Sequence, residues 1–76
     1  MTDARPRKRS LTLHGHRTSV SMEEAFWTAF VEMARAEGLS INALAARIDR
    51  ERGVSAGLAS AIRVAVLRHA QSLSRD

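Results

Sequence analysis

The residues of this 76-residue sequence that could do chemistry are mainly basic side chains near its N-terminus. Residues 1–20 contain a single acid and five basic residues: Arg5, Arg7, Lys8, Arg9 and Arg17. The rest of the chain carries as many acids as bases, so this segment accounts for the whole formal net charge of +4. Such a concentration of positive charge favours a polyanionic partner, with nucleic acid ahead of a membrane surface. The alternative is a solvated basic tail without a partner.

Two histidines and a group of aromatic residues offer other chemistry. In an extended strand, the imidazoles of His14 and His16 would lie on one face and could bind a metal ion. Two ligands do not make a zinc site, so we expect no metal, and a contact from either histidine to a phosphate is the stronger hypothesis. An aromatic group at residues 26–30 could stack on bases, but its helical spacing indicates a core, with Trp27 in a subunit interface or half exposed.

Little in the sequence favours catalysis. The chain has no cysteine, which excludes a thiol nucleophile and cysteine-ligated metal centres. Glu23 and Glu24 adjoin at an expected helix start, where the helix dipole explains them, and no Ser/His/acid arrangement follows from the spacing. We therefore expect neither an enzyme nor a cofactor. No apolar stretch reaches the length of a membrane span or a signal peptide, so we expect no membrane partner and a cytoplasmic protein.

The hydropathy pattern divides the chain into an arm and one domain. Residues 1–9 show no periodicity and are expected to form a flexible basic arm, followed by a single domain over residues 10–76. Polar and apolar residues alternate from Ser10 to Met22, which predicts a strand over about residues 10–21. Gly15 interrupts this alternation and marks either a bend in one long strand or a turn between two short ones.

Three helices are expected after the strand, over about residues 22–37, 40–52 and 56–73. Each segment repeats apolar residues at i, i+3, i+4 and i+7, which is the spacing of one buried helix face. The predicted N-caps are Ser21, Ser40 and Ser55. Gly38 is the expected left-handed stop of the first helix.

A single strand in a helical chain leaves a row of backbone donors and acceptors without partners. The simplest remedy is the same strand from a second copy, placed antiparallel across a two-fold axis. A chain of this length also buries only a thin core, which a second copy would enlarge. We therefore expect a homodimer. The alternative is an internal hairpin that turns at residues 14–17.

The order of these elements resembles the ribbon-helix-helix (MetJ/Arc-type) family of DNA-binding proteins. The similarity begins at residues 17–22 and is sharpest at Gly38, Leu39, Ser40, Ile41 and Asn42, which are similar to the family's Gly-x-Ser-(apolar)-Asn turn. The stretch KRSLTLHGHRTSVSMEEAFW more narrowly resembles a group of short bacterial ribbon-helix-helix proteins. The resemblance covers about residues 8–70, and the third helix departs from the minimal two-helix pattern.

This resemblance implies a mainly α fold with one short β-strand. Two chains would form an intertwined homodimer with an intermolecular two-stranded antiparallel ribbon, and each would add an extra C-terminal helix. The ribbon would enter the major groove of double-stranded DNA. Its base-contacting side chains would be Arg17, Ser19 and Ser21, while Thr18, Val20 and Met22 would face the helices.

The resemblance also implies phosphate contacts beside the ribbon. The N-terminus of the second helix would bind a phosphate near Ser40, Ile41 and Asn42. Further contacts to the DNA backbone are expected from the basic segment and one histidine: Arg5, Arg7, Lys8, Arg9 and His16.

The function implied is sequence-specific DNA binding by a bacterial transcriptional regulator of the repressor type. The alternative is an antitoxin-like module, or another module that binds a protein partner through its C-terminal helix. Val64 and Leu67 lie off the main apolar stripe of that helix. If they are exposed, they form an apolar patch for a partner, and if they are buried, they enlarge the core.

Overall fold

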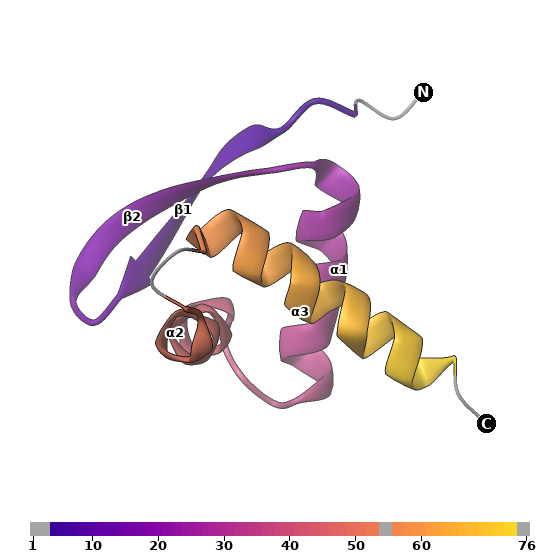
Figure 1. Ribbon diagram of the computed structural model, residues 1–76. Helices are drawn as coiled ribbons and strands as arrows, with labels where there is room; N and C mark the ends of the chain where they lie inside the picture. Colours follow the sequence, from indigo (N-terminus) through magenta and orange to yellow (C-terminus); the bar gives the residue numbers. More distant parts are fainter. Residues whose placement is uncertain (1–3, 54–55, 75–76) are drawn as a thin grey trace.

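The computed structural model describes residues 4–53 and 56–74, which form a two-stranded ribbon followed by three helices (Figure 1). The elements are β1 (Arg7–Leu13), β2 (His16–Met22), α1 (Glu24–Ala36), α2 (Ile41–Glu51) and α3 (Leu58–Leu73). The ribbon lies beside α2 and the start of α3, and α3 crosses α1. This arrangement confirms the ribbon-helix-helix fold with an extra C-terminal helix.

The ribbon is a hairpin within one chain. β1 pairs with β2 antiparallel, from Leu13 opposite His16 to Arg7 opposite Met22. The two residues between the strands, His14 and Gly15, have φ values of 53° and 80°. Positive φ at both positions is what the tight type I′ turn requires, and its twist matches that of the strands it joins.

This hairpin corrects the expectation of one strand paired with a second copy. The alternation predicted extended backbone on both sides of Gly15, but the turn folds the two halves onto each other. The strand is therefore not an orphan, and the need for a partner strand disappears. The expected arm over residues 1–9 is corrected at its C-terminal end, because β1 begins at Arg7 and residues 7–9 pair with β2.

One face of the ribbon packs against the helices. Leu11, Leu13, Val20 and Met22 are buried on this face, and none of them is more than 7% exposed. Adjacent strand residues point to opposite faces, so the residues between them point outward. The inward direction predicted for Val20 and Met22 is confirmed.

The helix ends follow local signals, with one exception. Gly38 adopts a left-handed φ of 70° after α1, and the Ser40 hydroxyl accepts the N–H of Ala43 at 3.0 Å, as predicted for a helix stop and an N-cap. Ser21 was the predicted cap of α1, but the strand continues to Met22 and the N-cap is Glu23. α3 begins at Leu58, and its predicted cap Ser55 lies outside the described residues.

The core draws on every element of the described structure. Its largest fully buried side chains are Phe30, Leu11, Met22, Leu44 and Ile62. Phe30 packs against the half-buried Trp27, with ring centroids 5.6 Å apart. The aromatic group is therefore part of the core, as its helical spacing predicted. Among the described helices, none combines the length and the apolar character that crossing a membrane requires.

Candidate nucleic-acid interface

The ribbon presents one exposed, polar and basic face to solvent. Because Lys8 pairs with Ser21, Ser10 with Ser19 and Thr12 with Arg17, these six side chains share the face opposite the core. All six are exposed, and none is acidic. We call this surface the outer face: Lys8, Ser10, Thr12, Arg17, Ser19 and Ser21. It contains all three predicted base-contacting residues, together with hydroxyl groups that can donate or accept hydrogen bonds.

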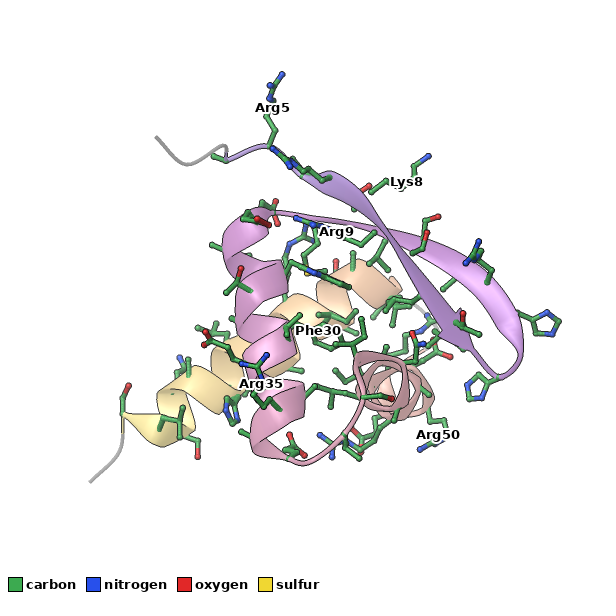
Figure 2. The ribbon with its side chains drawn as sticks, turned by 180° about the vertical axis from the view of Figure 1, so that it is seen from behind. Arg5, Lys8, Arg9, Phe30, Arg35 and Arg50 are labelled. Carbon is green, nitrogen blue, oxygen red and sulfur yellow. The ribbon has the colours of Figure 1, made fainter. Side chains whose placement is uncertain are left out.

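Arg9 belongs to the other face of the ribbon. Its Nη2 donates to Glu24 Oε2 at 2.7 Å, and its guanidinium lies 5.3 Å from the ring centroid of Trp27. Figure 2 shows Lys8 pointing away from the helices and Arg9 pointing toward α1. Arg9 is therefore engaged in an internal contact and does not belong to the outer face. The period-two pattern contained this signal, because Arg9 is in phase with Leu11 and Leu13.

The other predicted phosphate residues near the ribbon lie at different places along it. Arg5 precedes β1 and extends away from the body of the protein in Figure 2. Arg7 is exposed at the start of β1, opposite Met22. His16 is exposed at the other end of the ribbon, where it is the first residue of β2.

The two histidines do not share a strand face, because His14 lies in the turn. Its Nε2 is 3.6 Å from Asp49 Oδ2 on α2. Arg52 donates a hydrogen bond to the same carboxylate at 2.6 Å, and this bond is the main reason why the pKa of Asp49 is lowered. Within residues 4–53 and 56–74, no three His, Cys, Asp or Glu side chains group closely enough to hold a metal ion.

Arg63 of α3 holds the far end of β2, a role that the sequence did not reveal. Its Nη2 donates to the backbone oxygen of Ser21 at 3.1 Å, and its Nε donates to Glu23 Oε1 at 2.9 Å. The pKa of Glu23 is lowered by a hydrogen bond from its own backbone and then by the bond from Arg63. The extra helix therefore fixes the junction between the ribbon and α1.

The N-terminus of α2 lies beside β1. The first hydrogen bond of this helix runs from Leu44 N–H to Ser40 O at 3.0 Å, so the N–H groups of Ile41 and Asn42 have no acceptor within the helix. Together with the helix dipole, such groups favour an anion. The Asn42 side chain reaches the ribbon, because its Oδ1 accepts the backbone N–H of Thr12 at 3.0 Å. The structure thus brings the predicted phosphate site next to the outer face.

Comparison with known proteins agrees with this geometry. A family model described as ribbon-helix-helix domain matches residues 6–70. Among solved structures, an uncharacterized protein from Bordetella pertussis Tohama I is similar, with 35% sequence identity and a TM-score of 0.77. The alignment covers 96% of this chain and 63% of that protein, so this chain spans less than two thirds of its length. No curated protein matches the sequence. Because the family model covers most of the chain, including both strands and α1 and α2, this protein belongs to the ribbon-helix-helix domain family.

Proposed function

We propose that this protein binds double-stranded DNA sequence-specifically and acts as a transcriptional regulator of the repressor type. Ribbon-helix-helix domains are in general DNA-binding regulators of transcription. The observation that carries the proposal is the outer face, where two cations and four hydroxyl side chains form one exposed surface without an acid. A two-stranded ribbon fits the major groove, where base edges present a distinct pattern of donors and acceptors.

The roles within this interface follow from the chemistry of each side chain. Arg17 can donate two hydrogen bonds to one guanine, and Ser19 and Ser21 can contact several base edges. The α2 N-terminus at Ser40, Ile41 and Asn42 would bind a phosphate at the groove edge, which positions the ribbon without reading the sequence. Lys8 would contact the DNA backbone, with further backbone contacts from Arg5, Arg7 and His16.

A salt titration of duplex binding tests the contribution of Lys8. Removing one cation that neutralises one phosphate should flatten the slope of log affinity against log salt by about 0.9 for each chain that contacts the duplex. We therefore expect Lys8→Ala to bind more weakly and with this shallower slope. Arg35→Ala is the matched control, because Arg35 is an exposed cation on α1, away from the ribbon (Figure 2). Equal slopes for Lys8→Ala and the unmodified protein would contradict the proposed contact.

We further propose that the protein is a homodimer, as ribbon-helix-helix proteins typically are when they bind DNA. Since each ribbon closes within its own chain, the two copies need another contact. The exposed large apolar side chains of the described residues all lie on α3: Val64, Leu67 and Leu73, at 46%, 53% and 73% exposed. Val64 borders a groove of about 360 Å³ between α3 and the end of α2.

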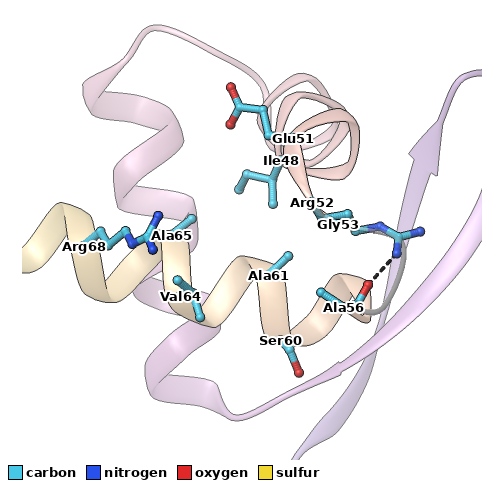
Figure 3. Close-up of a pocket in the computed structure, with 10 residues that line it drawn as sticks. All are labelled: Ile48, Glu51, Arg52, Gly53, Ala56, Ser60, Ala61, Val64, Ala65 and Arg68. Atoms are coloured by element: carbon cyan, nitrogen blue, oxygen red, sulfur yellow. Dashed lines mark hydrogen bonds between the residues drawn. The ribbon is translucent and has the colours of Figure 1, made fainter.

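This groove suits a second copy of the same chain. Small side chains at Ala61 and Ala65 allow another helix to approach closely, and Ile48 forms an apolar wall (Figure 3). Glu51 and Arg68 on its rim carry opposite charges. In a dimer with two-fold symmetry, Glu51 of each copy can contact Arg68 of the other copy, so this pair can form two reciprocal contacts.

The mass of the protein in solution tests this contact. We expect light scattering to give the mass of two chains, and Val64→Glu to shift it toward one chain, because Val64 borders the groove and a charge would be buried at the contact. Thr28→Glu adds the same charge at an exposed position of α1 and should leave the dimer intact. A dimer that is insensitive to Val64→Glu would contradict the α3 contact. It would instead favour the second candidate, in which the exposed apolar face of α3 binds another protein, as in an antitoxin-like module.

A further inference from the structure

Asn42 connects the two parts of the proposed interface. The bond from Thr12 N–H to Asn42 Oδ1 is 3.0 Å long and joins residues 30 positions apart in the sequence. Thr12 lies on β1 directly opposite Arg17 on β2. A single side chain at the start of α2 therefore contacts the strand pair that carries the proposed base-contacting arginine.

This bond also closes an edge of the ribbon. In an antiparallel pair, backbone N–H groups point alternately toward the partner strand and away from it. The N–H of Thr12 points away from β2 and would be left on an open edge, but the carboxamide of Asn42 accepts it. The spacing between the outer face and the N-terminus of α2 is held at this point by one hydrogen bond.

The contact determines how the carboxamide is oriented. A backbone N–H can only donate, so the oxygen of Asn42 must face Thr12 and the NH2 group must point elsewhere. Asn42 is exposed and lies in the first turn of α2, where the helix end favours an anion. Its NH2 group is thus available to donate to a phosphate. Aspartate could accept from Thr12 but could not donate, and alanine could do neither.

We propose that Asn42 is a positioning residue that sets the distance between the base-contacting ribbon and the phosphate-binding end of α2. The inference rests on the proposed DNA binding, but its structural half can be tested without DNA. When the bond to Thr12 is lost, the ribbon and the helix end no longer engage base edges and phosphate in one fixed geometry. Specific binding then loses more than nonspecific binding does, because only specific binding needs that geometry.

Amide hydrogen exchange in the free protein tests the bond itself. We expect the Thr12 amide to be protected in the unmodified protein and in Asn42→Asp, and to exchange rapidly in Asn42→Ala. The amides of Leu11 and Leu13 point toward β2 and should stay protected in all three, which controls for a folded ribbon. Unchanged protection of Thr12 in Asn42→Ala would overturn the proposal.

Duplex binding by the same proteins tests the positioning role. Asn42→Ala is expected to lower specific affinity by about 2- to 10-fold, the equivalent of one hydrogen bond, and to lower the ratio of specific to nonspecific affinity. Asn42→Asp keeps the bond to Thr12 but repels phosphate, so both affinities should fall together and the ratio should hold. If Asn42→Ala loses Thr12 protection yet keeps this ratio, Asn42 does not act as a positioning residue for DNA. If the unmodified protein binds no duplex, the proposed function fails, and the exchange result still reports on the bond.

Discussion

Arg17→Ala is expected to lower the affinity for a specific duplex by about 1 to 3 kcal/mol and to relax the base preference at one position of the site. Arg17 is exposed on the outer face, and β2 continues beyond it on both sides, so its backbone is held by the hairpin. Its removal takes away a planar donor pair without opening a cavity. Binding to a selected duplex and to a library of single-base variants measures both effects.

Arg9→Ala is the matched control for Arg17→Ala. It removes the same charge from the opposite face of the ribbon, where Arg9 pairs with Glu24 and covers Trp27. We expect this variant to lose stability through that ion pair and cation–π contact, while its base preference stays unchanged. If Arg17→Ala kept both affinity and base preference, the proposed base contact would be wrong.

Val20→Ser should reduce the free energy of unfolding by about 2 to 4 kcal/mol, because it removes buried methyl groups and places a hydroxyl in an apolar site. Val20 is 4% exposed and lies between the ribbon and the helices. For a small domain this is a large share of a total stability of about 5 to 15 kcal/mol. Denaturant unfolding in the absence of DNA gives the value directly.

The neighbouring residue provides the contrast for Val20→Ser. Ser19 lies on the outer face and is exposed, so Ser19→Ala should change stability by no more than about 0.5 kcal/mol. Its effect is expected in DNA binding instead. The opposite result would be a Val20→Ser protein that stays stable but changes its base preference, together with a Ser19→Ala protein that loses stability. This result would show that the ribbon presents the opposite face to DNA.

The sequence determined the direction of the strand side chains, the positions of the three helices and the turn between the first two. Alternation from Ser10 to Met22 identified the inward face of the ribbon, since successive side chains of a strand must point in opposite directions. The 3.6-residue repeat located the three helices. Gly38 and Ser40 marked the turn between the first two, because a left-handed φ suits glycine and a serine oxygen can accept a free N–H group of the first turn.

Only the tertiary structure decided which groups meet across the fold. Alternation is the same for a strand that pairs within its chain and one that pairs with a second copy, so the turn at His14 and Gly15 had to be seen in three dimensions. Because residues 1–9 were expected to form an arm, the alternation was not extended to Arg9, and a phosphate contact was expected from this residue. In the structure its guanidinium donates to Glu24. The contacts of Asn42 with Thr12 and of Arg63 with Ser21 join residues 30 and 42 positions apart. Periodicity describes the direction of a side chain relative to its own backbone, whereas the partner it reaches depends on how the elements pack.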